Sequence, residues 1–233
     1  MKLRSGYVKL ERAFSKLGYA SRKVAQELIL QGHVTVDGKL VKDPSFLVRP
    51  EIAKIEIRQN KIEIAEKMYF LFHKPRGVVT TRKDEKGRKT VFDYFKSYSC
   101  YLHAVGRLDF ATSGLLLLTN DTGFSAYYTD PKNEIERKYI VTVRGRFTNE
   151  KLEFAVQGLN TGGETLSAKS IEILKVSGKE TKMKVTLVEG KNREIRRLFQ
   201  ALGHEVTKLK RISFGIFELG DLEVGEVRKV IFD

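Results

Sequence analysis

A chain of 233 residues with 41% apolar residues is long enough to bury the core of one large domain, or of a small domain and a medium one. Its apolar runs are far shorter than the roughly 18 residues that a membrane helix needs, and its basic start lacks the apolar centre of a signal peptide. We therefore expect a cytoplasmic protein without a membrane partner. The single cysteine, Cys100, excludes an intramolecular disulfide, and four scattered histidines argue against a zinc site, so we expect no metal.

The formal charge of +14 is the clearest property of the composition. An excess of Lys and Arg in a folded chain is typical of proteins that bind phosphate-rich partners, above all nucleic acids. The alternative is a basic protein without such a partner, which charge alone does not exclude. Because the positive residues cluster beside structured motifs, we favour a nucleic-acid partner.

Two short helices and a hairpin are predicted at the start of the chain. Apolar residues recur at helical spacing over 10–17, Gly18 ends this helix, and Ser21 is a natural N-cap for a second one. The period then changes to two, with Asp37 and Gly38 at the turn of a hairpin. The outward basic residues of this unit form one predicted face: Arg12, Lys16, Arg22, Lys23 and Lys39. A solvated charged face without a ligand is the alternative.

Alternating isoleucines over 55–57 and 62–64 predict two edge strands that close this small unit. We place a domain boundary there, with one domain over 1–64 and another over 65–233. The second domain begins with an apolar strand over 68–72.

The segment "GRLDFATSGLLLLTND" (106–121) places Arg107 and Asp109 before four consecutive leucines. The length and the flanking turn residues of the run 115–118 predict a strand that is buried on both faces. A carboxylate at the mouth of such a strand costs solvation energy unless cations or hydrogen bonds compensate it. A structural ion pair and a reactive Asp109 held by an arginine both satisfy this requirement.

The rest of the chain alternates strands with few, short helices. Strands are predicted over 138–145 and on both sides of Ser177-Gly178, a helix over 192–203, and further strands to the end. This pattern predicts an α+β domain around one mixed, mainly antiparallel sheet. A glycine-rich phosphate loop of the usual spacing is missing, so we expect no nucleotide cofactor.

The segment "RAFSKLGYASRKVAQELILQGHVTVDGKLV" (12–41) resembles the small RNA-binding domain named after ribosomal protein S-four. The positions that carry the resemblance are Arg12, Gly18, Ser21, Arg22, Ala25, Leu28, Ile29, Gly32, Val34, Val36 and Gly38. The resemblance implies that this domain binds structured RNA. We expect Ser21 and the basic face described above to contact that RNA.

Three segments of the second domain resemble the motifs of the pseudouridine synthase family, specifically its RsuA-type branch that acts on ribosomal RNA. They are "GRLD" (106–109), "ERKYIV" (136–141) and "EGKNREIRRLFQALG" (189–203). The match extends to "HKPRGVVTT", "ATSGLLLLTND" and "VGEVRKV". The resemblance implies an enzyme that isomerises uridine to pseudouridine with a single aspartate and without a cofactor.

The resemblance assigns roles to four residues. It implies that Asp109 is catalytic, as a nucleophile or as a base. It implies that Arg196 pairs with this aspartate, that Tyr139 packs against the uracil, and that Arg107 fills the space left by the extruded base. Taken alone, Asp109 fits a turn, Tyr139 an ordinary strand aromatic and Arg196 a solvated helix cation. Their joint spacing favours the functional interpretation.

We expect further basic residues of the second domain to contact RNA phosphates, which positions the RNA without reading its sequence. They are Lys74, Arg76, Lys191, Arg193 and Arg197.

Two other classes of protein remain as alternatives. A glycoside hydrolase needs two carboxylates beside the scissile bond, and Asp109 has no such companion in the three motifs. A non-catalytic RNA-binding factor for ribosome assembly explains the charge but not the joint presence of Asp109, Tyr139 and Arg196. We expect a monomer whose partner is ribosomal RNA or a ribosome-assembly intermediate. The C-terminus is short, ending with "VRKVIFD", and lacks the basic tail that some large-subunit enzymes of the family carry. This favours small-subunit ribosomal RNA, with large-subunit RNA or transfer RNA as alternatives.

Overall fold

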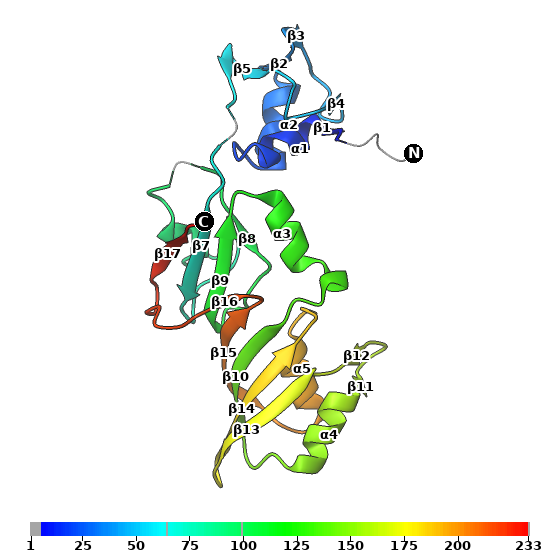
Figure 1. Ribbon diagram of the computed structural model, residues 1–233, viewed down its shortest axis with the longest axis vertical. Helices are drawn as coiled ribbons and strands as arrows, with labels where there is room; N and C mark the ends of the chain where they lie inside the picture. The colour runs from blue at the N-terminus through cyan, green and yellow to red at the C-terminus, as the bar shows by residue number, and fades with distance from the viewer. Residues whose placement is uncertain (1–5, 64, 99, 233) are drawn as a thin grey trace.

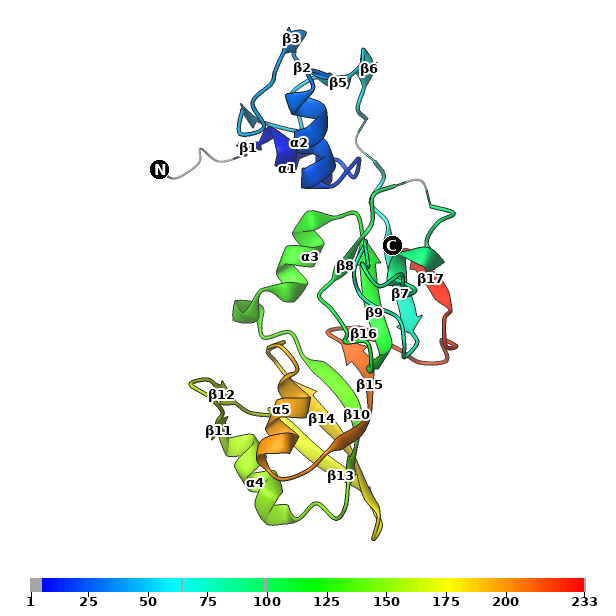
Figure 2. The same cartoon turned by 180° about the vertical axis from the view of Figure 1, so that it is seen from behind.

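The computed structural model describes residues 6–63, 65–98 and 100–232 of the chain. Figures 1 and 2 show a small N-terminal domain at one end and a larger α+β domain that continues from it. This is the predicted fold class. The predicted boundary at residue 64 remains a prediction, since that residue lies outside the described ranges.

The N-terminal domain packs two helices on small sheets. Helix α1 spans Leu10–Lys16 and α2 spans Arg22–Leu30, and both bury one apolar face in a core of their own. The strands are β1 (Val8–Lys9), β2 (Val34–Val36), β3 (Lys39–Leu40), β4 (Leu47–Val48), β5 (Ile55–Ile57) and β6 (Asn60–Lys61). Their order is β3-β2-β5-β6 in one sheet, while β1 pairs with β4.

Local sequence signals place these elements as predicted. The Ser21 side-chain oxygen caps α2 by accepting a hydrogen bond from Val24 N at 3.2 Å. Asp37 and Gly38 adopt positive φ angles of 50° and 77° at the turn between β2 and β3.

The strand expected over 62–64 is not found at residues 62 and 63, and residue 64 lies outside the described ranges. Arg58 and Gln59 form a tight turn with positive φ angles of 48° and 69°, which places Asn60 directly opposite Ile57. The pairing therefore falls on β6, and Ile62 is 7% exposed in the domain core. Strand β5 is an inner strand of the sheet and not an edge.

A nine-stranded mixed sheet forms the larger domain, in the order β13-β14-β10-β15-β9-β7-β17 with β16 and β8 attached at its side. The strands are β7 (Tyr69–Lys74), β8 (His103–Val105), β9 (Ser113–Thr119), β10 (Arg137–Arg144), β13 (Ser170–Val176), β14 (Glu180–Leu187), β15 (Val206–Phe214), β16 (Phe217–Glu218) and β17 (Val227–Val230). A separate hairpin consists of β11 (Leu159–Asn160) and β12 (Thr165–Leu166).

Few helices accompany this sheet. They are α3 (Thr122–Thr129), α4 (Asn149–Gln157) and α5 (Glu194–Ala201), with short 3₁₀ helices η1 (Val91–Tyr94) and η2 (Pro131–Asn133). Figure 2 shows α4 and α5 in front of the part of the sheet that contains β10, β13 and β14. Buried side chains of α4 and α5 share one apolar core with these strands. Among the described residues, none of the helices is long and apolar enough to cross a membrane.

The run of four leucines is a strand buried on both faces, as predicted. Leu116 and Leu118 belong to one apolar core of the domain, and Leu115 and Leu117 belong to the other. All four side chains are at most 2% exposed. Strand β9 thus lies between two apolar cores, and it anchors the segment before it, which carries Asp109.

Strands β9 and β15 join the two halves of the sheet through a short parallel contact. Ser113 pairs with Lys210, and Gly114 pairs with Arg211. Gly114 has a φ of 111°, and a Cβ atom at this position would collide with the backbone of Arg211. Glycine is therefore required at this junction for the close approach of the two chains.

The side chain of Asn120 ties the linker between the two domains to the end of β9. Its Oδ1 accepts a hydrogen bond from Met68 N at 2.8 Å, and its Nδ2 donates one to Glu66 O at 2.7 Å. A backbone bond from Tyr101 N to Gly18 O at 3.0 Å connects the domains directly. These contacts fix how the linker leaves the N-terminal domain.

Candidate active site

A cleft of about 610 Å³ opens where the two halves of the large sheet meet. Its walls come from the segment before β9, the starts of β10 and α5, the loop after β14, and β15. The four residues to which the sequence assigned catalytic or substrate roles all line it: Arg107, Asp109, Tyr139 and Arg196. The tertiary structure thus brings three distant sequence motifs to one place.

Asp109 lies in a turn that several contacts hold rigid. Its carbonyl oxygen accepts a hydrogen bond from Thr112 N at 3.0 Å, and the next residue, Phe110, accepts one from Gly77 N at 2.8 Å. The Asp109 side chain is 33% exposed. Its carboxylate therefore faces the cleft and can be reached from solvent.

The cation nearest to this carboxylate is not the predicted one. In the described part of the chain, the ion pair of Asp109 is with Arg193, whose Nη1 lies 3.8 Å from Oδ2. Arg196 instead donates to two backbone carbonyls, Val206 O at 2.8 Å and Ala111 O at 3.3 Å. The predicted direct pair between Arg196 and Asp109 is therefore absent from this conformation.

Arg196 is still electrostatically linked to the site. Burial lowers its pKa most, the positive charge of Arg193 lowers it further, and the negative charge of Asp109 opposes both effects. Two guanidinium groups thus stand beside one carboxylate. Arg193 is more than half exposed, whereas Arg196 is half-buried.

Helix α5 begins later than predicted, at Glu194. Arg193 adopts a left-handed conformation with a φ of 49° and stands at the N-cap position. The segment before it, 189–192, is an irregular loop along the wall of the cleft. This turn of the backbone directs Arg193 away from the helix and toward Asp109.

Tyr139 is 8% exposed and lies on β10, where it pairs with Val185 of β14 and Arg211 of β15. Its neighbours at every second position, Val141 and Val143, are fully buried in the core. The ring therefore belongs to a rigid wall of the cleft and not to a flexible loop.

Three buried charged residues of the cleft were missed by the sequence analysis: Arg137, Glu194 and Arg211. Arg137 donates to Val188 O at 2.7 Å and to Tyr128 O at 3.1 Å. Arg211 donates from Nε to Leu115 O at 2.7 Å. Burial raises the pKa of Glu194 and lowers that of Arg137.

Only part of this group had a signal in the sequence. Arg137 and Glu194 belong to the quoted motifs, two residues before Tyr139 and directly after Arg193. Their place in these motifs was the signal that could have identified them. Arg211 stands in an ordinary strand pattern, and its burial follows only from the parallel contact between β9 and β15.

Lys74 is buried, so its predicted contact with RNA phosphate is wrong for this structure. The side chain is 0% exposed, and its Nζ donates to Thr112 O at 2.8 Å and to Pro75 O at 2.9 Å. Burial lowers the pKa of Lys74 to about 8, an effect that the charge of Asp109 opposes. The ammonium group supports the Asp109 turn from inside the protein.

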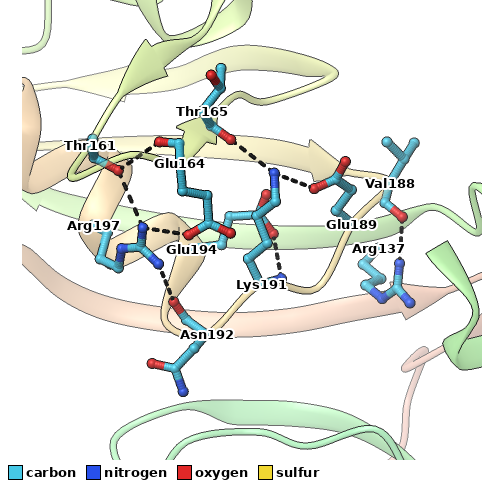
Figure 3. A network of polar contacts seen from close by, with 10 residues as sticks. All are labelled: Arg137, Thr161, Glu164, Thr165, Val188, Glu189, Lys191, Asn192, Glu194 and Arg197. Carbon is cyan, nitrogen blue, oxygen red and sulfur yellow. Dashed lines mark hydrogen bonds and ion pairs between the residues drawn. The ribbon is translucent and has the colours of Figure 1, made fainter.

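Two further predicted phosphate contacts are engaged within the protein. Arg197 forms an ion pair of 2.6 Å with Glu164, and Lys191 donates to Thr165 O at 2.8 Å (Figure 3). Lys16 of the N-terminal domain likewise pairs with Glu51 at 3.1 Å. The remaining predicted contacts are exposed side chains: Arg12, Arg22, Lys23, Lys39, Arg76 and Arg107. Ser21 is half-buried and engaged as the cap of α2.

Residues 68–201 match the sequence profile of the family described as RNA pseudouridylate synthase, and residues 12–51 match that of the S4 domain. The first match covers more than half of the chain and includes Asp109, Tyr139 and Arg196. The chain belongs to the RNA pseudouridylate synthase family. The cleft therefore stands in an RNA-modifying enzyme with an N-terminal RNA-binding domain, as the sequence motifs predicted.

Similar proteins share both domains of this pseudouridine synthase. It is 40% identical over 224 residues to the ribosomal large subunit pseudouridine synthase B of Bacillus subtilis (strain 168), covering 95% of this chain and 91% of that protein. It is 35% identical over 215 residues to the protein of the same name from Escherichia coli (strain K12), covering 89% and 73%. A crystal structure of a pseudouridylate synthase superposes with a TM-score of 0.68 at 30% identity, covering 96% of each chain.

Proposed function

We propose that this enzyme isomerises a uridine of large-subunit ribosomal RNA. The observation that supports this substrate is the 40% identity to a large-subunit enzyme across nearly the whole length of both chains. The sequence analysis favoured the small subunit because the chain ends soon after its last strand. Where a chain ends says less about its substrate than similarity that extends through both RNA-contacting domains, so we replace that preference.

We propose Asp109 as the catalytic residue. The reaction breaks the bond between N1 of uracil and C1′ of ribose, turns the base and forms the C5–C1′ bond. C5 then loses its proton and N1 gains one, so that the product is an isomer of the substrate. An ionised carboxylate at the end of a rigid turn can attack C1′ as a nucleophile or remove a ribose proton as a base. Both roles require the orientation that Thr112, Gly77 and the buried Lys74 impose on the turn.

The arginines and the tyrosine of the cleft have complementary roles in this proposal. Arg193, at 3.8 Å from the carboxylate, offsets its charge, while Arg196 holds the carbonyl of Ala111 two residues further along. Tyr139 supplies a rigid aromatic wall for the flipped uracil, a contact worth about 1–3 kcal/mol per base. Arg107 is exposed at the rim of the cleft, where it can fill the space that the base leaves in the RNA.

The test is to map pseudouridine in both ribosomal RNAs of a strain that lacks the gene, by carbodiimide treatment and reverse transcription. We expect one large-subunit site to lose its stop, wild-type protein to restore it, and Asp109→Asn to restore nothing while still binding the RNA. Asp221→Asn, which removes the same charge from an exposed acid that pairs with Arg228, is the control and should restore the site.

A lost site in small-subunit or transfer RNA would contradict the proposed substrate. Restoration by Asp109→Asn would contradict the catalytic assignment. A deletion strain with an unchanged pseudouridine pattern in all of its RNAs would favour the non-catalytic alternative.

A further inference from the structure

We propose that the β11–β12 hairpin is a positioning element for the reaction, because it holds the loop 189–193 and thereby keeps Arg193 against Asp109. Glu164 is the hairpin residue through which it acts. This inference rests on the proposed catalytic role of Asp109. It adds a residue outside the cleft that none of the three motifs contains.

Arg193 needs external support in its observed conformation. Side chains with a Cβ atom disfavour the left-handed region, yet Arg193 adopts a φ of 49° there. Its own side chain does not cap α5, and it is 53% exposed. Backbone conformations of this kind persist only where the surrounding structure over-determines them.

The hairpin supplies two of the supporting contacts, which Figure 3 shows from close by. Lys191 reaches from the loop to the hairpin and donates from Nζ to Thr165 O at 2.8 Å. Arg197, one helical turn after Arg193, pairs with Glu164 at 2.6 Å and also donates to Asn192 O at 3.3 Å. Glu164 thus orients the guanidinium that holds the residue directly before Arg193.

The inner side of the loop is held from the protein core. Arg137 donates to Val188 O at 2.7 Å, just before the loop, and Glu194 accepts from Lys191 N at 3.1 Å, just after it. Both side chains are at most 6% exposed. The core therefore holds the start of the loop at Val188 and its middle at Lys191, and the hairpin holds its outer side.

Loss of the ion pair between Glu164 and Arg197 should lower the rate of the reaction more than the stability of the protein. The side chains of Arg197 and Glu164 are 32% and 39% exposed, and ion pairs with this exposure contribute little to stability. Catalysis is far more sensitive, because a misplacement of about 1 Å lowers a rate about 100-fold.

An RNA contact is the rival explanation of the same residues. In that case Arg197 and Lys191 bind phosphate, and Glu164 only masks their charge in the free protein. Removing the charge of Glu164 would then strengthen RNA binding and leave the chemistry unchanged. The two explanations thus differ in the quantity that Glu164→Gln changes, which is the rate in the first and the RNA affinity in the second.

The experiment uses the full-length protein and ribosomal RNA that carries tritium at C5 of uracil, prepared from the deletion strain. Tritium release under single-turnover conditions is measured for wild type, Glu164→Gln and the control Glu153→Gln, which removes the same charge from an exposed position on α4. For Glu164→Gln we expect a maximal rate lowered about tenfold and a half-saturating concentration within about twofold of wild type. The control should match wild type in both.

A double-mutant cycle shows whether Glu164 acts through Arg193. In an Arg193→Ala background, Glu164→Gln should cause no further loss of rate, because the side chain that it positions is gone. As a readout independent of activity, amide hydrogen exchange over 190–194 should be faster in Glu164→Gln than in wild type.

Tighter RNA binding by Glu164→Gln at an unchanged rate would overturn the inference in favour of the phosphate contact. The inference would also be overturned if hydrogen exchange over 190–194 were unchanged in Glu164→Gln. The same holds if Glu164→Gln lowered the rate about tenfold in the Arg193→Ala background, as it is expected to do in the wild type. If the proposed substrate is wrong, the wild-type protein itself will release tritium from another RNA and not from large-subunit RNA. The variants are then compared on that other RNA.

Discussion

Arg196 connects two separate segments beside the cleft through its guanidinium group. It donates to Val206 O at the start of β15 and to Ala111 O in the turn after Asp109. A planar group with fixed donor directions suits two acceptors on different segments, whereas a lysine offers a single point charge. The side chain thus acts on the carboxylate mainly by fixing the backbone around it.

We therefore expect Arg196→Lys to lower the single-turnover rate by about 10–100-fold with RNA affinity within about threefold of wild type. Tritium release and filter binding measure the two quantities. Arg146→Lys makes the same exchange at an exposed arginine and should change neither. An Arg196→Lys enzyme that only binds RNA more weakly would show that Arg196 is a phosphate contact.

Lys74 is an unusual residue because its amino group is enclosed between two carbonyl groups. A neutral amine still has two N–H groups for Pro75 O and Thr112 O, so the observed bonds survive deprotonation. The folded protein therefore disfavours the charge without losing the contacts, which is consistent with a pKa lowered to about 8.

Lys74→Met should destabilise the protein by about 2–4 kcal/mol at pH 7, because the buried carbonyl of Thr112 and the half-buried carbonyl of Pro75 lose their donor. The difference should grow at higher pH. Between pH 8 and the usual lysine pKa of about 10.4, Lys74 binds more protons in the unfolded protein than in the folded one. The free energy of unfolding of the wild type therefore rises with pH in this range, by up to about 2 kcal/mol at pH 9.5 relative to the variant. Urea titrations at both pH values measure this, and a difference that shrinks as pH rises would contradict the assignment.

At the scale of elements, the parallel contact between β9 and β15 decides where the cleft forms. It brings Asp109, which precedes β9, beside the end of the strand that carries Arg211. The contact covers two residue pairs, Ser113 with Lys210 and Gly114 with Arg211, so its geometry depends on few atoms.

Two glycines test this junction. Gly114→Ala should lower the free energy of unfolding by more than about 3 kcal/mol or prevent folding, because the new methyl group collides with the Arg211 backbone. Gly145 also has a positive φ, of 80°, but open space around it, so Gly145→Ala should cost only about 1 kcal/mol. Urea unfolding of both variants measures the loss in free energy of unfolding. Gly145→Ala reports the effect of the positive φ alone, and Gly114→Ala reports that effect together with the collision. Equal losses would refute the role of the junction.

At the scale of the whole molecule, the N-terminal domain and the β13–β14 hairpin lie at opposite ends (Figure 1). Exposed cations occur at both ends, and Arg22 and Lys23 on α2 belong to the face that the sequence predicts to bind RNA. The contacts of Asn120 fix the linker between that domain and the active-site cleft. We expect one continuous RNA footprint from α2 to the cleft.

The double variant Arg22→Ala/Lys23→Ala should weaken RNA binding and reduce the slope of log affinity against log salt by about 1–2, because each lost phosphate contact removes about 0.7–0.9 from that slope. The rate at saturating RNA should stay unchanged. Lys175→Ala/Lys179→Ala removes the same charge at the opposite end and should leave the slope as in wild type. Equal effects of the two double variants would show that net charge, and not this face, governs binding.

Local structure and family membership were available from the sequence alone. Caps, turns and periodicity operate over a few neighbouring residues, so the Ser21 cap, the Asp37-Gly38 turn and the doubly buried β9 were predicted. The α+β class with a mainly antiparallel sheet followed from the order of such elements. The three motifs named the family because their residue types and spacing occur together.

Only the tertiary structure decided which cations lie beside the Asp109 carboxylate, which remain exposed for RNA, and which bond to other groups of the protein. Arg193, Arg196 and Arg197 follow one another on a basic segment, yet a left-handed residue at the helix start turns Arg193 toward Asp109. Distant partners, Glu164 for Arg197 and Thr112 for Lys74, engage the others. The burial and the hydrogen-bond partner of a side chain depend on segments far away in the chain, and a sequence pattern contains no information on their approach.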